Sequence, residues 1–287
     1  MMTTAAEETP HSCTTEGRLA GASDDGWTDI PRLFREGDGV LPPPWQDVFG
    51  PLRRGQADGL VVVGQFGQSI DARIATVSGD SRYINGAAGL AHLHRLRALV
   101  DAVLIGVGTA CMDDPQLTVR RVCGPSPARV VVDPSGRLSA SAKVLAADGI
   151  RRLVITRSGV CPALPPGVEV AALPDTDGHI APATMLAALA ERGFRRILVE
   201  GGAHTVSQFL AARCLDRLHV TIAPIIIGAG PASVSLPPIE KLNEALRAPI
   251  RAHVLGEELL VDCDLSAGRL PLPQPLAASD GVAKKST

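Results

Sequence analysis

The sequence predicts an α/β protein of three layers, in which helices flank a mostly parallel sheet. Short runs rich in Val, Ile and Leu alternate with segments of helical spacing, a pattern typical of βαβ units. Apolar residues make up 45% of the 287 residues, which is enough for a sizeable core. Aromatic residues make up only 3%, so the core must consist mainly of aliphatic side chains, as in buried parallel strands.

The expected strands are short apolar runs bounded by glycine or charged residues. In chain order they cover residues 59–66, 101–107, 128–133, 152–156, 196–200 and 218–224. Apolar residues recur every three or four positions over 90–100, 185–189 and 206–210, which predicts helices. Residues 250–261, with Gly256 near the middle, predict a closing antiparallel hairpin.

Composition divides the chain into three parts. Residues 1–56 predict an N-terminal extension that is disordered or a docking arm, residues 57–265 the folded domain, and residues 266–287 a C-terminal tail. Apolar clusters around Trp27 and Trp45 interrupt the extension. The alternatives for them are local helical turns that pack on their own core, and docking on the domain or on a second subunit.

Charge and cysteine content exclude several classes of function. The chain carries 28 basic and 30 acidic residues, a formal charge of −2, which argues against nucleic acid or an anionic membrane as a partner. No stretch approaches the ~18 consecutive apolar residues that span a bilayer. The six cysteines include no CxxC pair, so we expect free thiols and a cytoplasmic protein.

No metal site is predicted, and familiar catalytic loops are absent. His92 and His94 stand two residues apart and would point away from each other on a helix. The motifs GxxxxGKS/T, GxSxG and HExxH do not occur. A GxGxxG dinucleotide fingerprint fails because its third glycine would fall on Cys111.

Glycine follows three of the predicted strands, at the ends where α/β sheets bind ligands. These turns are Gly106–Thr109, which contains Gly108, Glu200–Ala203, which contains Gly201 and Gly202, and Gly228–Gly230. Glycine lets backbone N–H groups approach a phosphate, and a following helix N-terminus adds partial positive charge. Together the turns predict a nucleotide pyrophosphate site, whereas each one alone is more often a tight turn.

Two further segments hold more polar residues than a turn requires. The first runs from Ser69 to Ala75 and continues over 78–84, and the second runs from Asp113 to Arg120. The alternative is that both are exposed loops in which Asp residues cap turns.

At these residues the chain resembles a known family. The segments that carry the resemblance are SIDARIA, SGDSRYI, HRLRA, DAVLIGVGT, DDPQLTVR, RVVVDPSGRL, LVEGGA and APIIIG, in family order over residues 58–262. They are similar to the C-terminal reductase domain of the bifunctional riboflavin-biosynthesis deaminase/reductase, whose fold resembles dihydrofolate reductase. DDPQLTVR followed by VEGG is the most specific part.

The resemblance implies a homodimeric, NADPH-dependent reductase of 5-amino-6-(5-phosphoribosylamino)uracil. In that family a hydride goes to the sugar carbon bonded to the exocyclic nitrogen, which opens the ribose to a ribityl chain. The implied NADPH contacts are Gly67, Tyr83, Thr109, Asp113 and the run 202–208, which includes Gly202, Ala203, His204 and Thr205. The implied substrate contacts are Ser81, Arg97, Leu117, Arg120 and Glu200.

The chemistry of these residue types suits such roles. Arg97 and Arg120 can hold a phosphate through bidentate forks. Glu200 can accept hydrogen bonds from sugar hydroxyls, and with Asp71 it is a candidate catalytic residue, Asp71 for orienting the substrate or assisting proton transfer. Arg157, just past a predicted strand, is the candidate for the cofactor's 2′-phosphate. The alternatives are a solvated helix residue at 97, a helix N-cap at 200 and a turn cap at 71.

Departures from the family pattern bear on the substrate. Ala72 replaces a usual glycine, Gln65 a frequent lysine beside the substrate, and Tyr83 a common tryptophan. The deaminase signature HxE followed by PCxxC is absent, so we expect reduction without deamination. Two alternatives stay open: a reductase of another pterin-like or sugar-linked heterocycle, and a sensor that binds the nucleotide without turnover. A phosphate clamp by Arg97 and Arg120 favours the enzyme.

Overall fold

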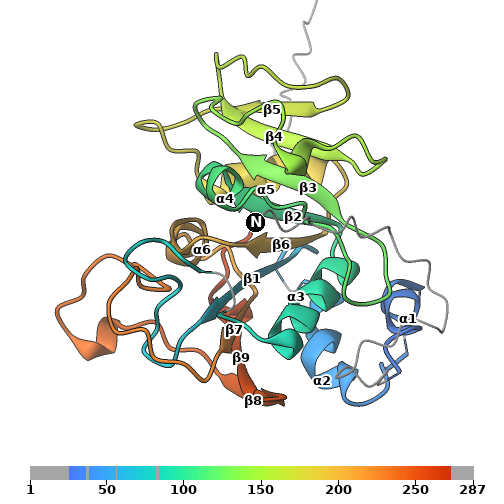
Figure 1. Cartoon of the computed structure of the whole chain (residues 1–287), viewed down its shortest axis with the longest axis vertical. Helices are drawn as coiled ribbons and strands as arrows, with labels where there is room; N and C mark the ends of the chain where they lie inside the picture. The colour runs from blue at the N-terminus through green and yellow to red at the C-terminus, as the bar shows by residue number, and fades with distance from the viewer. Residues whose placement is uncertain (1–25, 37–38, 56, 82–83, 273–287) are drawn as a thin grey trace, which may run out of the picture.

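The computed structural model describes residues 26–36, 39–55, 57–81 and 84–272 (Figure 1). Within them the chain forms a nine-stranded sheet of order β5-β4-β3-β2-β6-β1-β7-β9-β8. The strands are β1 (Val61–Gln68), β2 (Ala102–Gly106), β3 (Ala128–Val132), β4 (Arg152–Arg157), β5 (Glu169–Leu173), β6 (Arg196–Glu200), β7 (Arg217–Ile222), β8 (Ile250–Leu255) and β9 (Glu258–Asp264). The α-helices are α1 (Ile30–Glu36), α2 (Trp45–Phe49), α3 (Ala87–Leu99), α4 (Val107–Asp113), α5 (Pro182–Glu191) and α6 (Ala203–Ala211).

Helices cover both faces of the sheet, which confirms the predicted three-layer class. On one face, apolar side chains of α1 to α4 join alternate strand residues such as Val103 and Leu198 in one core cluster. On the other face, α5 and α6 pack on the intervening strand residues around Phe209. Because successive strand residues point to opposite faces, both faces of a central strand such as β2 must be apolar.

The sheet is parallel from β5 to β7 and antiparallel at its other end. β1 pairs in parallel with β6 and β7, whereas β9 pairs antiparallel with β7 and β8. In Figure 1 the sheet runs from β5 at the top to β8 at the bottom. The predicted closing hairpin is confirmed, and its turn at Gly256 has a left-handed φ of +63°.

The apolar clusters of the N-terminal extension pack on α3 and join the core of this same chain. Trp27 lies edge-on to Trp45, with ring centroids 5.2 Å apart. Phe49 stacks on His92 of α3 at 5.6 Å and an interplanar angle of 15°. At the other end of the chain, Arg269 is buried and its guanidinium lies 2.8 Å from a carboxylate oxygen of Asp58.

The predicted strand boundaries differ from those of β1, β2, β3, β4, β6 and β7 by at most two residues. The sequence reasoning missed β5, because this edge strand buries only Ala171 and lacks a continuous apolar run. Helices α1 and α2 are the local helical turns expected in the two apolar clusters, whereas the sequence reasoning missed α4. Helix α4 follows β2 directly, with Gly106 as its N-cap.

Four described cysteines, Cys111, Cys161, Cys214 and Cys263, are free thiols. Cys123 is disulfide-bonded, so the expectation of free thiols is wrong for that residue. Among the described residues, no helix is long and apolar enough to cross a membrane. The same part of the chain holds no group of three metal-ligating side chains.

Candidate active site

Glu200 ends β6, one strand away from β2, and stands in register with Gln65 of β1. Both side chains lie on the face of the sheet that α3 covers, as do their neighbours Leu198 and Val63 two residues earlier. The carboxyl ends of β1, β2 and β6 therefore converge beside Glu200, at the edge where parallel sheets place ligand sites.

A buried ion pair joins α3 to this edge. Arg97, in the last turn of α3, donates from Nε to Glu200 Oε2 at 2.8 Å and from Nη2 to Oε1 at 2.5 Å. The two side chains are only 7% and 12% exposed. Nη1 of Arg97 donates to the carbonyl oxygen of Thr118 at 3.0 Å. Sequence reasoning assigned the Arg97 guanidinium to a phosphate. In the structure it binds the Glu200 carboxylate and the segment after α4.

Two of the three glycine turns lie together at this edge. The backbone N–H of Gly202 donates to the Thr109 hydroxyl oxygen at 3.1 Å, which ties the end of β6 to α4. A Cβ on Gly106 would lie 2.6 Å from the Thr205 hydroxyl oxygen, so this position needs glycine for the close approach of α6. Gly201 adopts a left-handed φ of +96°, which also favours glycine.

The third glycine turn has a different partner. Gly228 N–H donates to Asp71 Oδ2 at 2.7 Å, and Ile227 N–H donates to Oδ1 at 3.0 Å. The Ser69 hydroxyl donates to the same Oδ1 at 2.6 Å. These hydrogen bonds, that of Ser69 above all, lower the pKa of Asp71 to about 2. At neutral pH Asp71 is therefore an ionised acceptor that anchors the turn after β7, a state that disfavours proton donation.

Ala72, which replaces the usual family glycine, lies at a position with an unusual backbone conformation. Ala72 lies in the left-handed region at φ +59°, where a glycine would be unstrained. An L-residue with a Cβ in this region costs about 1 kcal/mol. The left-handed backbone conformation explains why the family usually has glycine at this position. Ala72 by itself is therefore no argument for a different substrate.

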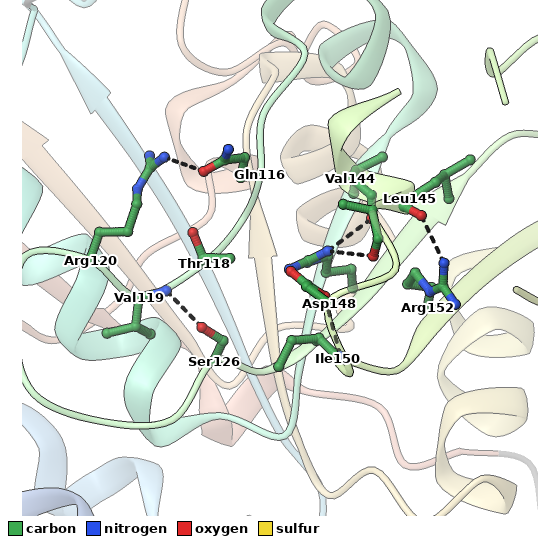
Figure 2. A network of polar contacts seen from close by, with 12 residues as sticks. Gln116, Thr118, Val119, Arg120, Ser126, Val144, Leu145, Asp148, Ile150 and Arg152 are labelled. Carbon is green, nitrogen blue, oxygen red and sulfur yellow. Dashed lines mark hydrogen bonds and ion pairs between the residues drawn. The ribbon is translucent and has the colours of Figure 1, made fainter. Parts of the chain in front are cut away.

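Arg120 is an exposed residue in the segment after α4. Figure 2 shows its guanidinium turned toward Gln116, to which Nη1 donates at 2.6 Å. The Arg120 backbone N–H donates to Nδ1 of His94 at 2.9 Å. Val119 N–H donates to the Ser126 hydroxyl at 2.9 Å and closes the same loop (Figure 2). The backbone of Arg120 is thus fixed while its guanidinium stays exposed.

His94 is a buried residue of this edge that sequence reasoning left out of the candidate site. It is 4% exposed, and burial, followed by the charges of Arg97 and Arg120, lowers its pKa to about 3. A neutral imidazole can accept the Arg120 N–H at Nδ1, whereas a protonated one cannot. The HRLRA segment contained the signal, but the partner lies 26 residues further on.

The remaining predicted residues are spread around this edge. Leu117 is buried with φ +55°, Gly67 lies near the end of β1, Asp113 ends α4, and Ser81, Gly108 and His204 are exposed. Ala203 begins α6 and is half-buried. Arg157 ends β4, two strands beyond β2, with Nη1 4.0 Å from Asp175 Oδ2. Tyr83 lies outside the described residues.

A groove of about 460 Å³ lies elsewhere, lined by Asp101, Ala128 and Phe194 among others. It sits at the amino ends of β2 and β3, opposite the edge that carries Glu200. The polar residues described above belong to the carboxyl edge, so we place the candidate site there.

The fold and this edge define an α/β protein of the dihydrofolate reductase type, with a candidate nucleotide site on paired glycine turns. The family model of the RibD C-terminal domain matches residues 61–255, and the chain belongs to that family.

Two named relatives agree with this assignment. The chain is 33% identical over 210 residues to the 2,5-diamino-6-ribosylamino-4(3H)-pyrimidinone 5′-phosphate reductase of Methanothermobacter thermautotrophicus, covering 68% of this chain and 93% of that protein. It is 34% identical over 202 residues to the riboflavin biosynthesis protein RibD of Aquifex aeolicus, covering 69% of this chain and 55% of that protein. The chain therefore spans about half the length of that RibD relative.

A solved structure supports the same family assignment. The crystal structure of a diaminohydroxyphosphoribosylaminopyrimidine deaminase/5-amino-6-(5-phosphoribosylamino)uracil reductase from Thermotoga maritima matches with a TM-score of 0.63 and 28% identity. The match covers 77% of this chain and 59% of that one.

The lowered pKa of His94 predicts a loss of stability in mild acid. Below about pH 6.5 the unfolded state takes up a proton at His94, whereas the folded state does so only near pH 3. Protonation thus favours unfolding throughout that window. Between about pH 7.5 and pH 5, His94 should remove about 2 kcal/mol of unfolding free energy. Urea unfolding of the wild type and of His94→Asn at both pH values measures this term. Equal losses in the two proteins would contradict it.

Proposed function

We propose that the chain is an NADPH-dependent reductase of a phosphoribosylamino-pyrimidine in riboflavin biosynthesis. The carrying observation is that the Arg97–Glu200 pair lies at the same sheet edge as the two joined glycine turns. In that arrangement the Glu200 carboxylate, which can bind polar groups of a substrate, lies beside glycine turns whose backbone suits a nucleotide.

The residues present fit a dinucleotide cofactor. A Cβ at Gly106 or Gly201 would crowd Thr205 or Thr109, so these turns depend on glycine. α6 begins directly after Gly202, and the partial positive charge of its first turn favours a pyrophosphate. Gly106, Gly201, Gly202 and the first turn of α6 would hold the pyrophosphate, and Arg157 remains our candidate for the 2′-phosphate.

Arg120 would hold the substrate phosphate. Its guanidinium is exposed, its charge is permanent, and its backbone is fixed through His94. Arg97 is buried, and three of its N–H donors bind Glu200 and Thr118. We therefore assign Arg97 to positioning Glu200 and Arg120 to the phosphate.

Hydride transfer from bound NADPH would form a C–H bond at the sugar carbon attached to the exocyclic nitrogen, while the bond from that carbon to the ring oxygen breaks. The released oxygen takes up one proton, which balances the reaction. Asp71, with its pKa of about 2, is unsuited to supply that proton. The protein's part is mainly to hold donor and acceptor carbons in contact. Glu200 orients sugar hydroxyls or ring N–H groups through its carboxylate.

Two pyrimidines fit this proposal. One is 5-amino-6-(5-phosphoribosylamino)uracil, the compound for which the reductase of the Thermotoga maritima relative is named. The other is 2,5-diamino-6-ribosylamino-4(3H)-pyrimidinone 5′-phosphate, named for the archaeal relative that the chain covers to 93%. That coverage makes the diamino compound the second candidate.

We also propose that the chain forms a homodimer through its edge strand β8. Ile250 and Val254 of this strand are 63% and 79% exposed, and within the described residues β8 has no strand on its outer side. Such an apolar edge strand favours a partner. A dimer at micromolar concentration in sedimentation velocity is the expected result, and a monomer would contradict it.

Loss of NADPH absorbance with each pyrimidine tests the activity, in the wild type and in Arg120→Ala. Losing a charge-assisted phosphate contact should lower kcat/KM about 100-fold, mostly through KM. Arg121→Ala is the matched control, because Arg121 is the exposed neighbouring arginine, and it should stay within about twofold of the wild type. NADPH binding without turnover of either compound would favour the sensor.

A further inference from the structure

Glu258 is a buried carboxylate to which the proposed reaction gives no role. It begins β9, directly after the turn of the closing hairpin, and is 5% exposed. It lies three residues beyond the part of the chain that the family model matches. A buried carboxylate is stable only when hydrogen-bonded or paired, so its partners indicate what it does.

The partners of Glu258 lie at the start of α3. Oε1 accepts from Gly86 N–H at 3.0 Å and from Asn85 Nδ2 at 2.9 Å. Oε2 accepts from Gly89 N–H at 2.6 Å. The N-cap residue of α3, Gly86, supplies no side-chain cap of its own. Glu258, at the start of β9, therefore caps the N-terminus of α3. At the same time it holds the amide side chain of Asn85.

The surrounding residues are shaped for this contact. A Cβ on Gly89 would lie 2.7 Å from Glu258 Oε1, so the close approach needs glycine. A Cβ on Gly67 would lie 1.5 Å from Asn85 Oδ1. Asn85 thus occupies the space that Gly67 leaves open, near the end of β1. Its amide nitrogen is held there by the hydrogen bond from Nδ2 to Glu258.

We propose that Glu258 is a positioning residue of the cofactor site, which it serves by holding Asn85 against Gly67. The inference rests on the proposed function and on the expectation that Gly67, near the end of β1, contacts NADPH. Glu258 contacts Asn85 and backbone N–H groups, so it acts through Asn85 and not on the cofactor itself. The closing hairpin then has a functional part, because its turn places Glu258 under the start of α3.

A double-mutant cycle in cofactor affinity tests this. NADPH fluorescence titration gives Kd for the wild type, Glu258→Gln, Asn85→Ala and the double variant. A glutamine keeps one acceptor oxygen and puts an NH2 donor in place of the other, facing backbone or amide N–H groups, so Glu258→Gln should loosen the hold on Asn85. Each single variant should raise Kd about tenfold, and the double variant should raise it no further. The steady-state kcat should stay within about threefold while KM for NADPH rises.

Glu257→Gln is the matched control, because Glu257 is the exposed neighbour in the hairpin turn. Its Kd should equal that of the wild type. Thermal melting and circular dichroism check folding. If Glu258→Gln does not fold, Gly89→Ala replaces it, since the added methyl group displaces the carboxylate from Asn85.

The outcomes separate the inference from the proposed function. Wild-type binding with an unchanged Kd in Glu258→Gln, even at a lower melting temperature, would show a helix cap only and overturn the inference. Additive effects of the two variants would overturn it too, because Glu258 would then not act through Asn85. A wild type that does not bind NADPH would refute the cofactor site itself, and the inference with it.

Discussion

The buried ion pair between Arg97 and Glu200 is the interaction on which the rest of the candidate site depends. Both charges are almost completely removed from water, so each requires the other. Arg97 stands in the last turn of α3, where the helix dipole also favours a cation. The pair fixes the end of α3 on β6, and the bond to Thr118 extends this hold to the segment that carries Arg120.

The same face of the sheet carries a row of buried polar residues that continues from this pair. Glu200, Gln65, His219 and Asp262 stand in successive register across β6, β1, β7 and β9. His92 of α3 contacts His219, with ring nitrogens 3.0 Å apart. α3 thus lies on polar as well as apolar side chains. The pairs Arg97–Glu200 and His92–His219 both fix its position.

Asp262 shows how this row is stabilised. Burial alone would raise its pKa, but contacts from His219 and Arg217 lower it to about 2. The pKa of His92 is held well below its usual value by burial and by His219. Asp262 and His92 therefore each keep one protonation state near neutral pH, and they form a fixed support under α3.

The local pattern of the sequence predicts the layers and the central strands, because buried parallel strands are continuous apolar runs. β5 escapes that pattern, since only Ala171 is buried there. Position at a strand end was also enough to place Glu200 and the glycine turns at one edge. The engagement of Arg97 was not predictable, because its partner lies 103 residues away and a solvated or phosphate-bound arginine gives the same local sequence. Glu258 was missed for the same reason, since its partners lie at the start of α3.

A double-mutant cycle on unfolding free energy tests most directly whether Arg97 serves Glu200. Arg97→Met and Glu200→Gln should each destabilise the protein, Arg97→Met by about 3–5 kcal/mol because it leaves a buried charge unpaired. The double variant should lose at least about 2 kcal/mol less than the sum of the two. Additive losses would show that the two charges do not depend on each other, and would contradict the assignment of Arg97 to positioning Glu200.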